Sequence, residues 1–184
     1  MTPEHQENLF NFVVPVSRRQ AREIALRVLY ALEISENSLN LVLNELKEYE
    51  QPNEELTCFI EHLVRKTYET REETDGLIRA RSANWKFERI AVIDRIIMRI
   101  AISEFLHFSD IPPKVSIDEA IELAKRYSTE KSSSYINGVL DGVYEDLKQK
   151  NRIIKTGRGR IDTQLRKNNT DKHSPPFTDT ATSH

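Results

Sequence analysis

Arginine side chains crowd one short stretch near the start of the chain, and their positions point to a definite chemistry. Arg18, Arg19 and Arg22 follow Ser17, a residue type that commonly caps helix N-termini. The free amides of such a terminus carry partial positive charge, so the helix dipole disfavours three cations there unless an anion is bound. Guanidinium groups beside free amides are typical of a phosphate site. This cluster therefore predicts contact with phosphate groups.

Tyr30 adds a feature that is typical of nucleic-acid binding. On a helix it lies nearly in line with Arg19, two to three turns further along. An aromatic ring can stack on a base, and the unstacked bases of single-stranded RNA suit such a surface better than duplex DNA does. The alternative is a solvated helix face in which Glu23 pairs with Arg19 and Arg27 at one-turn spacing.

A second polar patch lies after the middle of the chain. We expect residues 128–134 to form a polar link before the last helix, and flexible loops of this composition can read splayed RNA bases. The candidate RNA contacts here are Lys131, Ser132 and Tyr135, with Ser133, Ser134 and Asn137 beside them. The alternative is a linker whose serines only cap a helix.

Signatures of catalysis are missing from the sequence. The five histidines are scattered without the spacing of metal ligands, and neither a phosphate-binding loop nor a dinucleotide fingerprint occurs. Paired carboxylates such as Asp118 and Glu119 fit a helix N-terminus better than an acid/base site. We therefore expect no enzyme, no metal and no cofactor.

Composition and cysteine usage point to a compartment. The 184 residues carry a formal net charge of -2 and a single cysteine, Cys58, so an intrachain disulfide is impossible and a reducing environment is expected. Cys58 stands in an apolar run, and we predict a small core residue rather than a reactive thiol. The N-terminus lacks the charged start and apolar run of a signal peptide. We expect a cytoplasmic protein that contacts no membrane.

One stretch, residues 84–106, organises the rest of the chain. On a helix its apolar side chains cover nearly the whole circumference, apart from a polar line through Glu88, Arg95 and Arg99 and a separate point at Asp94. A helix that is apolar on almost every side must be buried. Because the stretch is too short and too charged to span a bilayer, we predict a central helix wrapped by other helices.

The other segments also show helical periodicity, and no alternating strand pattern occurs. Gly76 is expected to mark a kink, Ser116 and Glu119 to form a capping box, and Gly138 and Gly142 to allow close approach of a neighbouring backbone. Further helices are predicted over residues 17–33, 39–48, 54–81, 116–127 and 133–150. The predicted organisation is an N-terminal tail (1–16), an all-helical domain (17–148) with sub-bundles of about 17–82 and 83–148, and a basic, disordered C-terminal tail (149–184).

Four blocks of the sequence resemble the NusB family in residue identity and in order. The first block reads SRRQAREIAL from Ser17, and the second begins with Asn84 and Trp85 and extends to residue 105. The third reads PKVSIDEAIELAK from Pro113, and the fourth reads YINGVLD from Tyr135. The resemblance implies an all-helical domain of two small bundles. It also implies that the protein holds the boxA sequence of nascent RNA together with the ribosomal protein NusE. This complex tethers the RNA to elongating RNA polymerase with other Nus factors and suppresses termination, chiefly in ribosomal RNA operons.

The resemblance also assigns residues to these contacts. It implies RNA binding by Arg18, Arg19, Arg22 and Tyr30, joined by Lys131, Ser132 and Tyr135, and binding of the protein partner by Trp85, Glu88, Arg89 and Arg95. Two alternatives remain. A helical adaptor of the same fold would bind proteins but no RNA. The helical domain of an RNA methyltransferase would need a glycine-rich cofactor loop, which the sequence lacks.

Overall fold

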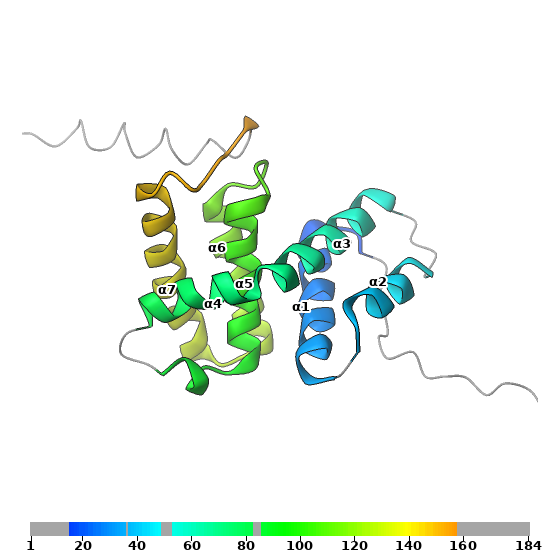
Figure 1. Ribbon diagram of the computed structural model, residues 1–184, viewed down its shortest axis with the longest axis horizontal. Helices are drawn as coiled ribbons and strands as arrows, with labels where there is room; N and C mark the ends of the chain where they lie inside the picture. The colour runs from blue at the N-terminus through cyan, green and yellow to red at the C-terminus, as the bar shows by residue number, and fades with distance from the viewer. Residues whose placement is uncertain (1–14, 36, 49–52, 83–85, 158–184) are drawn as a thin grey trace, which may run out of the picture.

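The computed structural model describes residues 15–35, 37–48, 53–82 and 86–157, and within these ranges the regular elements are all helices (Figure 1). The fold class predicted from the sequence is confirmed. In chain order the elements are α1 (Arg18–Ile34), α2 (Leu39–Glu48), α3 (Glu54–Glu69), α4 (Arg71–Arg81), the short 3₁₀ helix η1 (Phe87–Arg89), α5 (Val92–His107), α6 (Pro113–Tyr127) and α7 (Glu130–Gln149).

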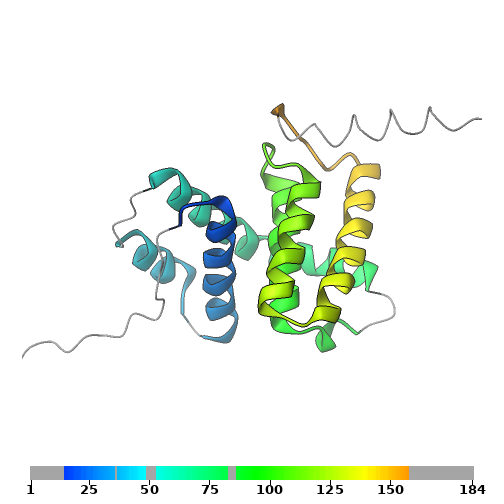
Figure 2. The ribbon, with the colours of Figure 1, turned by 180° about the vertical axis from the view of Figure 1, so that it is seen from behind.

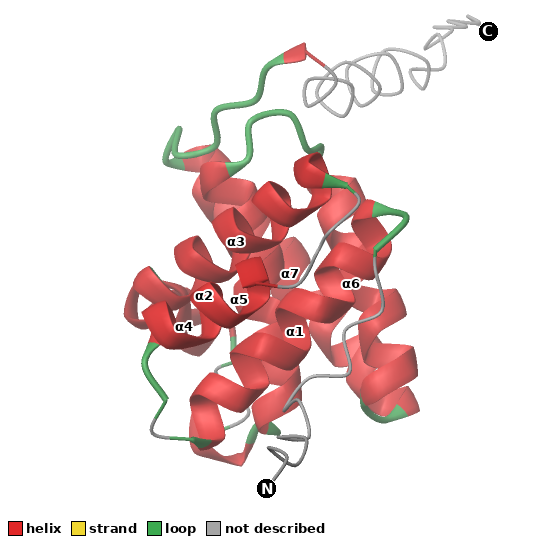
Figure 3. Ribbon diagram, turned by 90° about the vertical axis from the view of Figure 1, so that its right-hand side faces the viewer, coloured by secondary structure: helices red, strands yellow, loops and turns green. Residues whose placement is uncertain are grey.

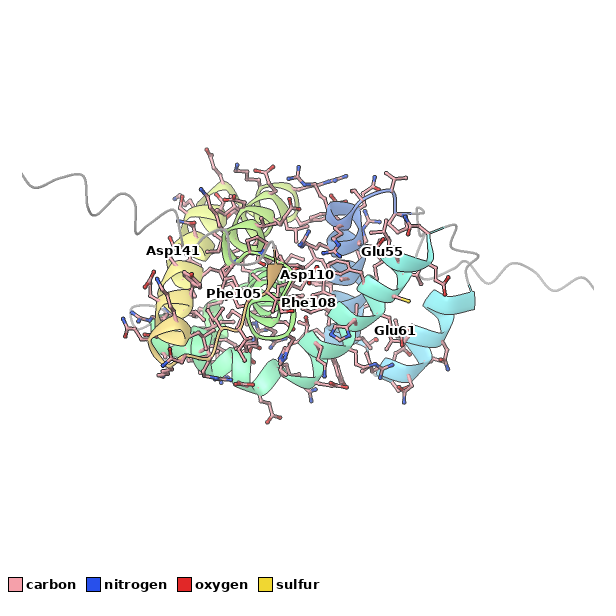
Figure 4. All side chains as sticks on the ribbon, turned by 90° about the horizontal axis from the view of Figure 1, so that it is seen from above. Glu55, Glu61, Phe105, Phe108, Asp110 and Asp141 are labelled. Carbon is pink, nitrogen blue, oxygen red and sulfur yellow. The ribbon has the colours of Figure 1, made fainter. Side chains whose placement is uncertain are left out.

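Helix α5 is the element on which the others pack. It contacts α1 and α3 on one side and α4, α6 and α7 on the other. Every residue from Ile96 to Phe105 is buried, and Phe105 lies at the centre of the molecule when it is viewed from above (Figure 4). A helix enclosed on all sides needs apolar residues around its circumference. The central, buried helix predicted from the sequence is therefore present.

The remaining helices form two groups around α5. Helices α1, α2 and α3 pack together on one side, and α6 and α7 pack together on the other (Figures 1 and 2). The predicted division placed residues 71–82 in the first group, whereas α4 packs against α5 and α7. None of the helices that the structure describes has both the length and the apolar composition to cross a membrane.

The long helix predicted over residues 54–81 is two helices that meet at Thr70. The Thr70 hydroxyl donates a hydrogen bond of 2.8 Å to the carbonyl of Lys66, and the Thr70 amide donates to the same carbonyl. A hydroxyl that competes for the helical carbonyl favours a bend at that position. Gly76, where a kink was expected, lies inside α4 and causes no break.

The central helix begins later than its apolar pattern indicated. Residues 87–89 form η1, Ile90 is extended, Ala91 precedes the helix, and α5 starts at Val92. This conformation buries Phe87 and Ile90 while it leaves Glu88 and Arg89 exposed. Apolar side chains on both sides of an extended segment give the same sequence signal as a helix that is apolar all round.

Helices α6 and α7 both begin earlier than predicted. Helix α6 starts at Pro113, since proline at the first helical position loses no intrahelical hydrogen bond there, and Ser116 is buried in the first turn rather than capping it. Helix α7 is capped by Thr129, whose hydroxyl accepts a hydrogen bond of 3.2 Å from the amide of Ser132. The polar patch around Lys131 is therefore helical and is not a flexible link.

Three further expectations differ from the structure. Cys58 is exposed on α3 instead of buried. A Cβ atom at Gly138 would meet open space, and one at Gly142 would meet the side chain of Arg81 rather than a backbone. Residues 150–157, placed in the disordered tail by the prediction, have a defined position, and the amide of Thr156 donates to the carbonyl of Ser109. The predicted tails at residues 1–14 and 158–184 lie outside the described residues.

Candidate nucleic-acid interface

The first turn of α1 forms as its sequence predicts. The Ser17 hydroxyl accepts a hydrogen bond of 3.3 Å from the amide of Gln20. The Gln20 side chain in turn accepts one of 2.7 Å from the amide of Val16. Both bonds satisfy amides at the start of the helix. Arg18 and Arg19 thereby project from the first turn into solvent.

Arg18 lies between three elements. Its guanidinium is 2.7 Å from Asp110 at the α5–α6 corner and 3.6 Å from Glu55 on α3, and both acidic residues are labelled in Figure 4. It also lies 5.0 Å from the centre of the Phe59 ring. Burial raises the pKa of Asp110, but the hydrogen bond and charge of Arg18 outweigh this and hold that pKa below its ordinary value. The cation at position 18 therefore has partners but remains accessible.

Arg19 faces α6 and is held there by one carboxylate. Its Nη2 lies 2.7 Å from Glu119 Oε1, and its Nε lies 3.1 Å from Glu119 Oε2, so the pair is bidentate. The hydrogen bond and charge of Glu119 raise the pKa of Arg19 above its ordinary value. The arginine is exposed, so this pair lies at the protein surface.

Arg22 differs from its two neighbours because it is buried. Its Nε donates a hydrogen bond of 2.7 Å to Glu104 on α5, and its Nη1 lies 3.8 Å from Glu119. The side chain occupies the contact between α1 and α5 and does not reach the surface. The geometry therefore gives no support to the predicted RNA contact of Arg22 and assigns it a structural function.

Helices α1 and α6 lie side by side in the views from behind and from the side (Figures 2 and 3), and the colours of Figure 2 show that they run in the same direction. Further along this contact Glu23 pairs with Arg126, and the hydroxyl of Tyr127 lies 3.2 Å from Glu23 and from Arg27. Glu23 thus pairs across to α6 rather than along α1. An open groove of about 330 Å³, lined by Arg19, Glu23, Glu119, Glu122, Lys125 and Arg126, lies between the helices.

The far end of α1 is apolar. Tyr30 and Ile34 are exposed there, and with Ile93 on α5 and Tyr127 on α6 they line a pocket of about 460 Å³. We call the surface made by Arg18, Arg19, Arg27, Tyr30, Arg126 and Tyr127 the α1–α6 face. Its polar groove and apolar pocket follow one another along α1. This order places exposed guanidinium groups before an exposed aromatic ring, as the sequence predicted.

The second predicted patch begins where α6 ends. Lys131 is exposed in the first turn of α7. Ser132 is buried, and its hydroxyl donates a hydrogen bond of 2.8 Å to Asp94. The Tyr135 hydroxyl lies 2.8 Å from that of Ser82. Lys131 is therefore available to a ligand, whereas Ser132 and Tyr135 hold α7 against α5 and α4.

The residues predicted for the protein partner surround η1. Glu88 and Arg89 are exposed, and Trp85 lies outside the described residues. Arg95 is half-buried, with its guanidinium 5.3 Å from the centre of the Phe87 ring, and Arg79 approaches the same ring to 4.1 Å. Arg79 and Arg95 therefore flank the buried ring of Phe87 and place two cations at this end of α5.

Sequence reasoning missed Arg126 and the pairing of Glu119. Both lie on α6, seven positions apart, which places them on one face of that helix. The sequence alone could therefore have shown that Glu119 and Arg126 share a helix face. Their partners on α1 are about 100 positions away in the sequence, with separations of 100 for Arg19 and 103 for Glu23, so the pairing itself could not have been predicted.

Comparisons with known proteins agree with this architecture. Residues 19–145 match the model of the NusB family. The transcription antitermination protein NusB of Salinibacter ruber is 46% identical over 146 residues, which are 79% of this chain and 91% of that protein.

Solved structures show the same fold. NusB of T. maritima superposes with a TM-score of 0.63 and 32% identity over 71% of this chain and 92% of that chain. A structure of the antitermination factors NusB and NusE with double-stranded RNA contains a similar chain. There the TM-score is 0.61 and the identity 25%, over 70% of this chain and 96% of that chain. The helical fold, the sequence blocks and the family match agree, and the chain belongs to the NusB family.

Proposed function

We propose that this protein is a transcription antitermination factor that binds boxA-type single-stranded RNA together with the ribosomal protein NusE. The complex tethers the nascent RNA to elongating RNA polymerase with other Nus factors and supports transcription of ribosomal RNA. The proposed function of this protein is to bind RNA and protein partners, and it includes no catalytic step and no cofactor. The name of the relative from Salinibacter ruber supports the antitermination part.

The observation that carries the RNA-binding part is the layout of the α1–α6 face. Arg18 and Arg19 lie at one end of α1 and Tyr30 lies near the other, a distance along the helix of roughly 16 to 18 Å at 1.5 Å per residue. Cations that meet a backbone and an aromatic ring that meets a base are the two components of single-strand binding. Lys131 is a further exposed cation, in the first turn of α7, which follows the end of α6 after two residues.

The similar chain in the solved NusB and NusE complex with double-stranded RNA supports both partners. We place the NusE contact around η1, where Glu88 and Arg89 are exposed and Arg79 and Arg95 flank Phe87. Trp85 belongs to this proposed contact by its sequence position. The two surfaces lie on different elements, so one molecule can hold RNA and protein together.

One observation favours the alternative of an adaptor that binds no RNA. Arg18, Arg19 and Arg126 each already pair with a carboxylate, as cations on a solvated helix face commonly do. A pure adaptor would need only the surface around η1. The two functions therefore differ in what the α1–α6 face binds.

Titration of labelled RNA against the protein, with and without purified NusE, tests the proposal. The variant is Arg18→Ala/Arg19→Ala, which leaves the buried Arg22 in place. The matched control is Arg65→Ala/Lys66→Ala, which removes two cations from α3, outside the α1–α6 face. Single-stranded boxA-type RNA and the duplex of the same sequence are compared.

The proposal expects tighter binding of the single strand when NusE is present. It also expects a loss of at least tenfold for Arg18→Ala/Arg19→Ala, with circular dichroism unchanged, and little loss for the control, since two phosphate contacts are removed only in the former. Equally weak RNA binding by all three proteins, with NusE still captured, would favour the adaptor instead. Preference for the duplex would contradict the single-strand assignment.

A further inference from the structure

The two arginines that line the α1–α6 groove share one arrangement. Arg19 pairs with Glu119, and Arg126 pairs with Glu23, each across the groove. The arginine side chains are 57% and 62% exposed, whereas the carboxylates are 14% and 12% exposed. In each pair the cation therefore lies outside and the acid lies inside.

Each carboxylate also has a second donor that lies deeper in the protein. Glu119 Oε2 is 3.8 Å from Nη1 of Arg22, whose side chain is only 5% exposed. Glu23 Oε2 accepts a hydrogen bond of 3.2 Å from the Tyr127 hydroxyl. If the outer arginine swings away, neither carboxylate loses its last partner. Since the large cost of breaking an ion pair is an orphaned buried group, release of these arginines is cheap.

A carboxylate and a phosphate offer an arginine the same geometry. Both present two oxygens to the planar fork of the guanidinium, and Glu119 already accepts from Arg19 in this bidentate manner. The groove of about 330 Å³ between the helices is open to solvent on the side where the two arginines lie. A strand of RNA on the α1–α6 face would bring its backbone phosphates to this position.

We propose that Glu119 and Glu23 occupy the phosphate-binding positions of Arg19 and Arg126 in the free protein. On binding, RNA phosphates replace the two carboxylates as the partners of these arginines. The inference rests on the proposed function and extends it in two respects. It adds Arg126 of α6 as a phosphate contact. It also implies that the two carboxylates lower RNA affinity, because they compete with phosphates for the same arginines. Binding is then an exchange of anions on the same two cations.

An exchange has a salt dependence that distinguishes it from simple charge attraction. A free cation that meets a phosphate changes the slope of log affinity against log salt by about 0.7 for single strands. In an exchange the uncovered carboxylate takes up a cation from solution, so part of that slope is lost. Removing the charge of the carboxylate should therefore strengthen RNA binding and make its salt dependence steeper.

The experiment measures affinity for single-stranded RNA over a series of KCl concentrations. The variants are Glu119→Gln, Arg126→Ala and the control Glu122→Gln. Glutamine keeps the size of Glu119 and one acceptor oxygen for Arg22. Glu122 lies on the same helix and lines the same groove, but its hydrogen bond of 2.8 Å goes to Lys125 and not to Arg19. The control thus removes an equal charge without breaking the pair.

Glu119→Gln is expected to bind RNA two- to fivefold more tightly at low salt, with a steeper salt slope, because a surface pair of this kind is worth at most about 1 kcal/mol. Glu122→Gln should gain clearly less. Arg126→Ala should weaken binding and make the slope shallower by less than the roughly 0.7 of a free cation, because Glu23 takes up a cation from solution when Arg126 leaves it. Circular dichroism and melting temperature confirm the fold of each variant.

Three results would overturn the exchange. Equal gains in RNA affinity for Glu119→Gln and Glu122→Gln would show a general charge effect. No gain in affinity for Glu119→Gln would show that its pair with Arg19 does not compete with RNA. An unchanged salt slope for Arg126→Ala would exclude the phosphate contact of Arg126. In each case wild-type RNA binding would leave the proposed function standing. If the wild-type protein bound no RNA at all, the proposed function and the exchange would fail together.

Discussion

Arg19 and Arg22 lie within one turn of α1, and both pair with a carboxylate of another helix, yet their surroundings are opposite. Arg22 is buried against α5, where it pairs with Glu104. Arg19 is exposed along α6, where it pairs with Glu119. We refer to Arg22–Glu104 and Arg99–Asp75 as the buried pairs, and to Arg19–Glu119 and Arg126–Glu23 as the outer pairs. The same chemistry thus serves two purposes on one helix.

The buried pairs hold the fold because their separation would leave charges without water. Arg99 makes hydrogen bonds of 2.7 and 2.8 Å to Asp75 of α4 and one of 2.9 Å to Glu33 of α1. Burial lowers the pKa of Arg99, but the hydrogen bonds and charges of Asp75 and Glu33 outweigh it and raise that pKa above its ordinary value. One side chain therefore joins three helices across the boundary between the two groups.

The outer pairs work differently because water replaces whichever partner leaves. In a high-dielectric surrounding, two unit charges attract by about 1 kcal/mol, and side-chain ordering cancels part of it. Such a pair adds little stability, and its arginine can be given to a ligand. Burial, rather than residue type, decides which arginine of α1 is structural and which is accessible to a ligand.

The largest expected effect is the loss of a buried pair. Arg99→Ala should lower the free energy of unfolding by about 3 to 5 kcal/mol, because it leaves Asp75 as an unpaired buried charge. The measurement is urea unfolding followed by circular dichroism. The control is Arg81→Ala, which breaks the exposed pair with Asp146 and should cost less than about 1 kcal/mol. Similar losses for the two variants would break the comparison.

A half-buried lysine sharpens the comparison because burial outweighs attraction there. Lys155 donates hydrogen bonds of 2.9 and 2.7 Å to the carbonyls of Glu104 and Phe108, and burial lowers its pKa to about 8. The unfolded chain, with a lysine pKa near 10.5, binds more protons between these values, so stability should rise with pH from about 8 to 10.5. A neutral amine keeps both donors.

The test compares wild type with Lys155→Met, which cannot titrate at this position. Unfolding free energies are measured at pH 7.5, 9 and 10.5. Wild type should gain on the order of 1 to 3 kcal/mol over the variant across this range. Parallel pH profiles would show that Lys155 is not buried in solution.

The outer pairs give a smaller effect on stability and a larger one on binding. Arg19→Ala should change the unfolding free energy by less than about 1 kcal/mol, while RNA affinity falls severalfold. Arg22→Ala should instead lower the unfolding free energy more than Arg19→Ala does, because it leaves Glu104 as an unpaired buried charge. Thermal unfolding and RNA titration of both variants check this. If Arg19→Ala proved as destabilising as Arg22→Ala, the distinction between outer and buried pairs would be lost.

The sequence predicted well what local patterns determine. Ser17 was correctly read as the N-cap of α1, and the apolar circumference of residues 92–107 correctly predicted a buried helix. Both depend on neighbours within a few turns. The start of α5 was wrong because a 3₁₀ turn and the link after it, which bury Phe87 and Ile90, imitate the same pattern.

The candidate site was predictable only in part because its pairs join distant segments. Arg22 has the same local sequence signal as Arg18 and Arg19, and only its partner Glu104, 82 positions away, makes it structural. Ser132 likewise reads as a polar surface residue until Asp94, 38 positions away, accepts its hydrogen bond. Burial of a polar residue is decided by tertiary contacts that no helical periodicity records.

The two glycines of α7 offer the finest test of how little an exposed pair contributes. Gly138→Ala should stabilise the protein by about 0.5 to 1 kcal/mol, since its Cβ would meet open space in a helix interior. A Cβ at Gly142 would lie 3.0 Å from Cδ of Arg81 and displace the pair of Arg81 with Asp146. If exposed pairs are weak, Gly142→Ala should lose only a few tenths of a kcal/mol relative to Gly138→Ala in urea unfolding. A net destabilisation by Gly142→Ala, abolished in an Arg81→Ala background, would instead show that an exposed pair can hold this fold.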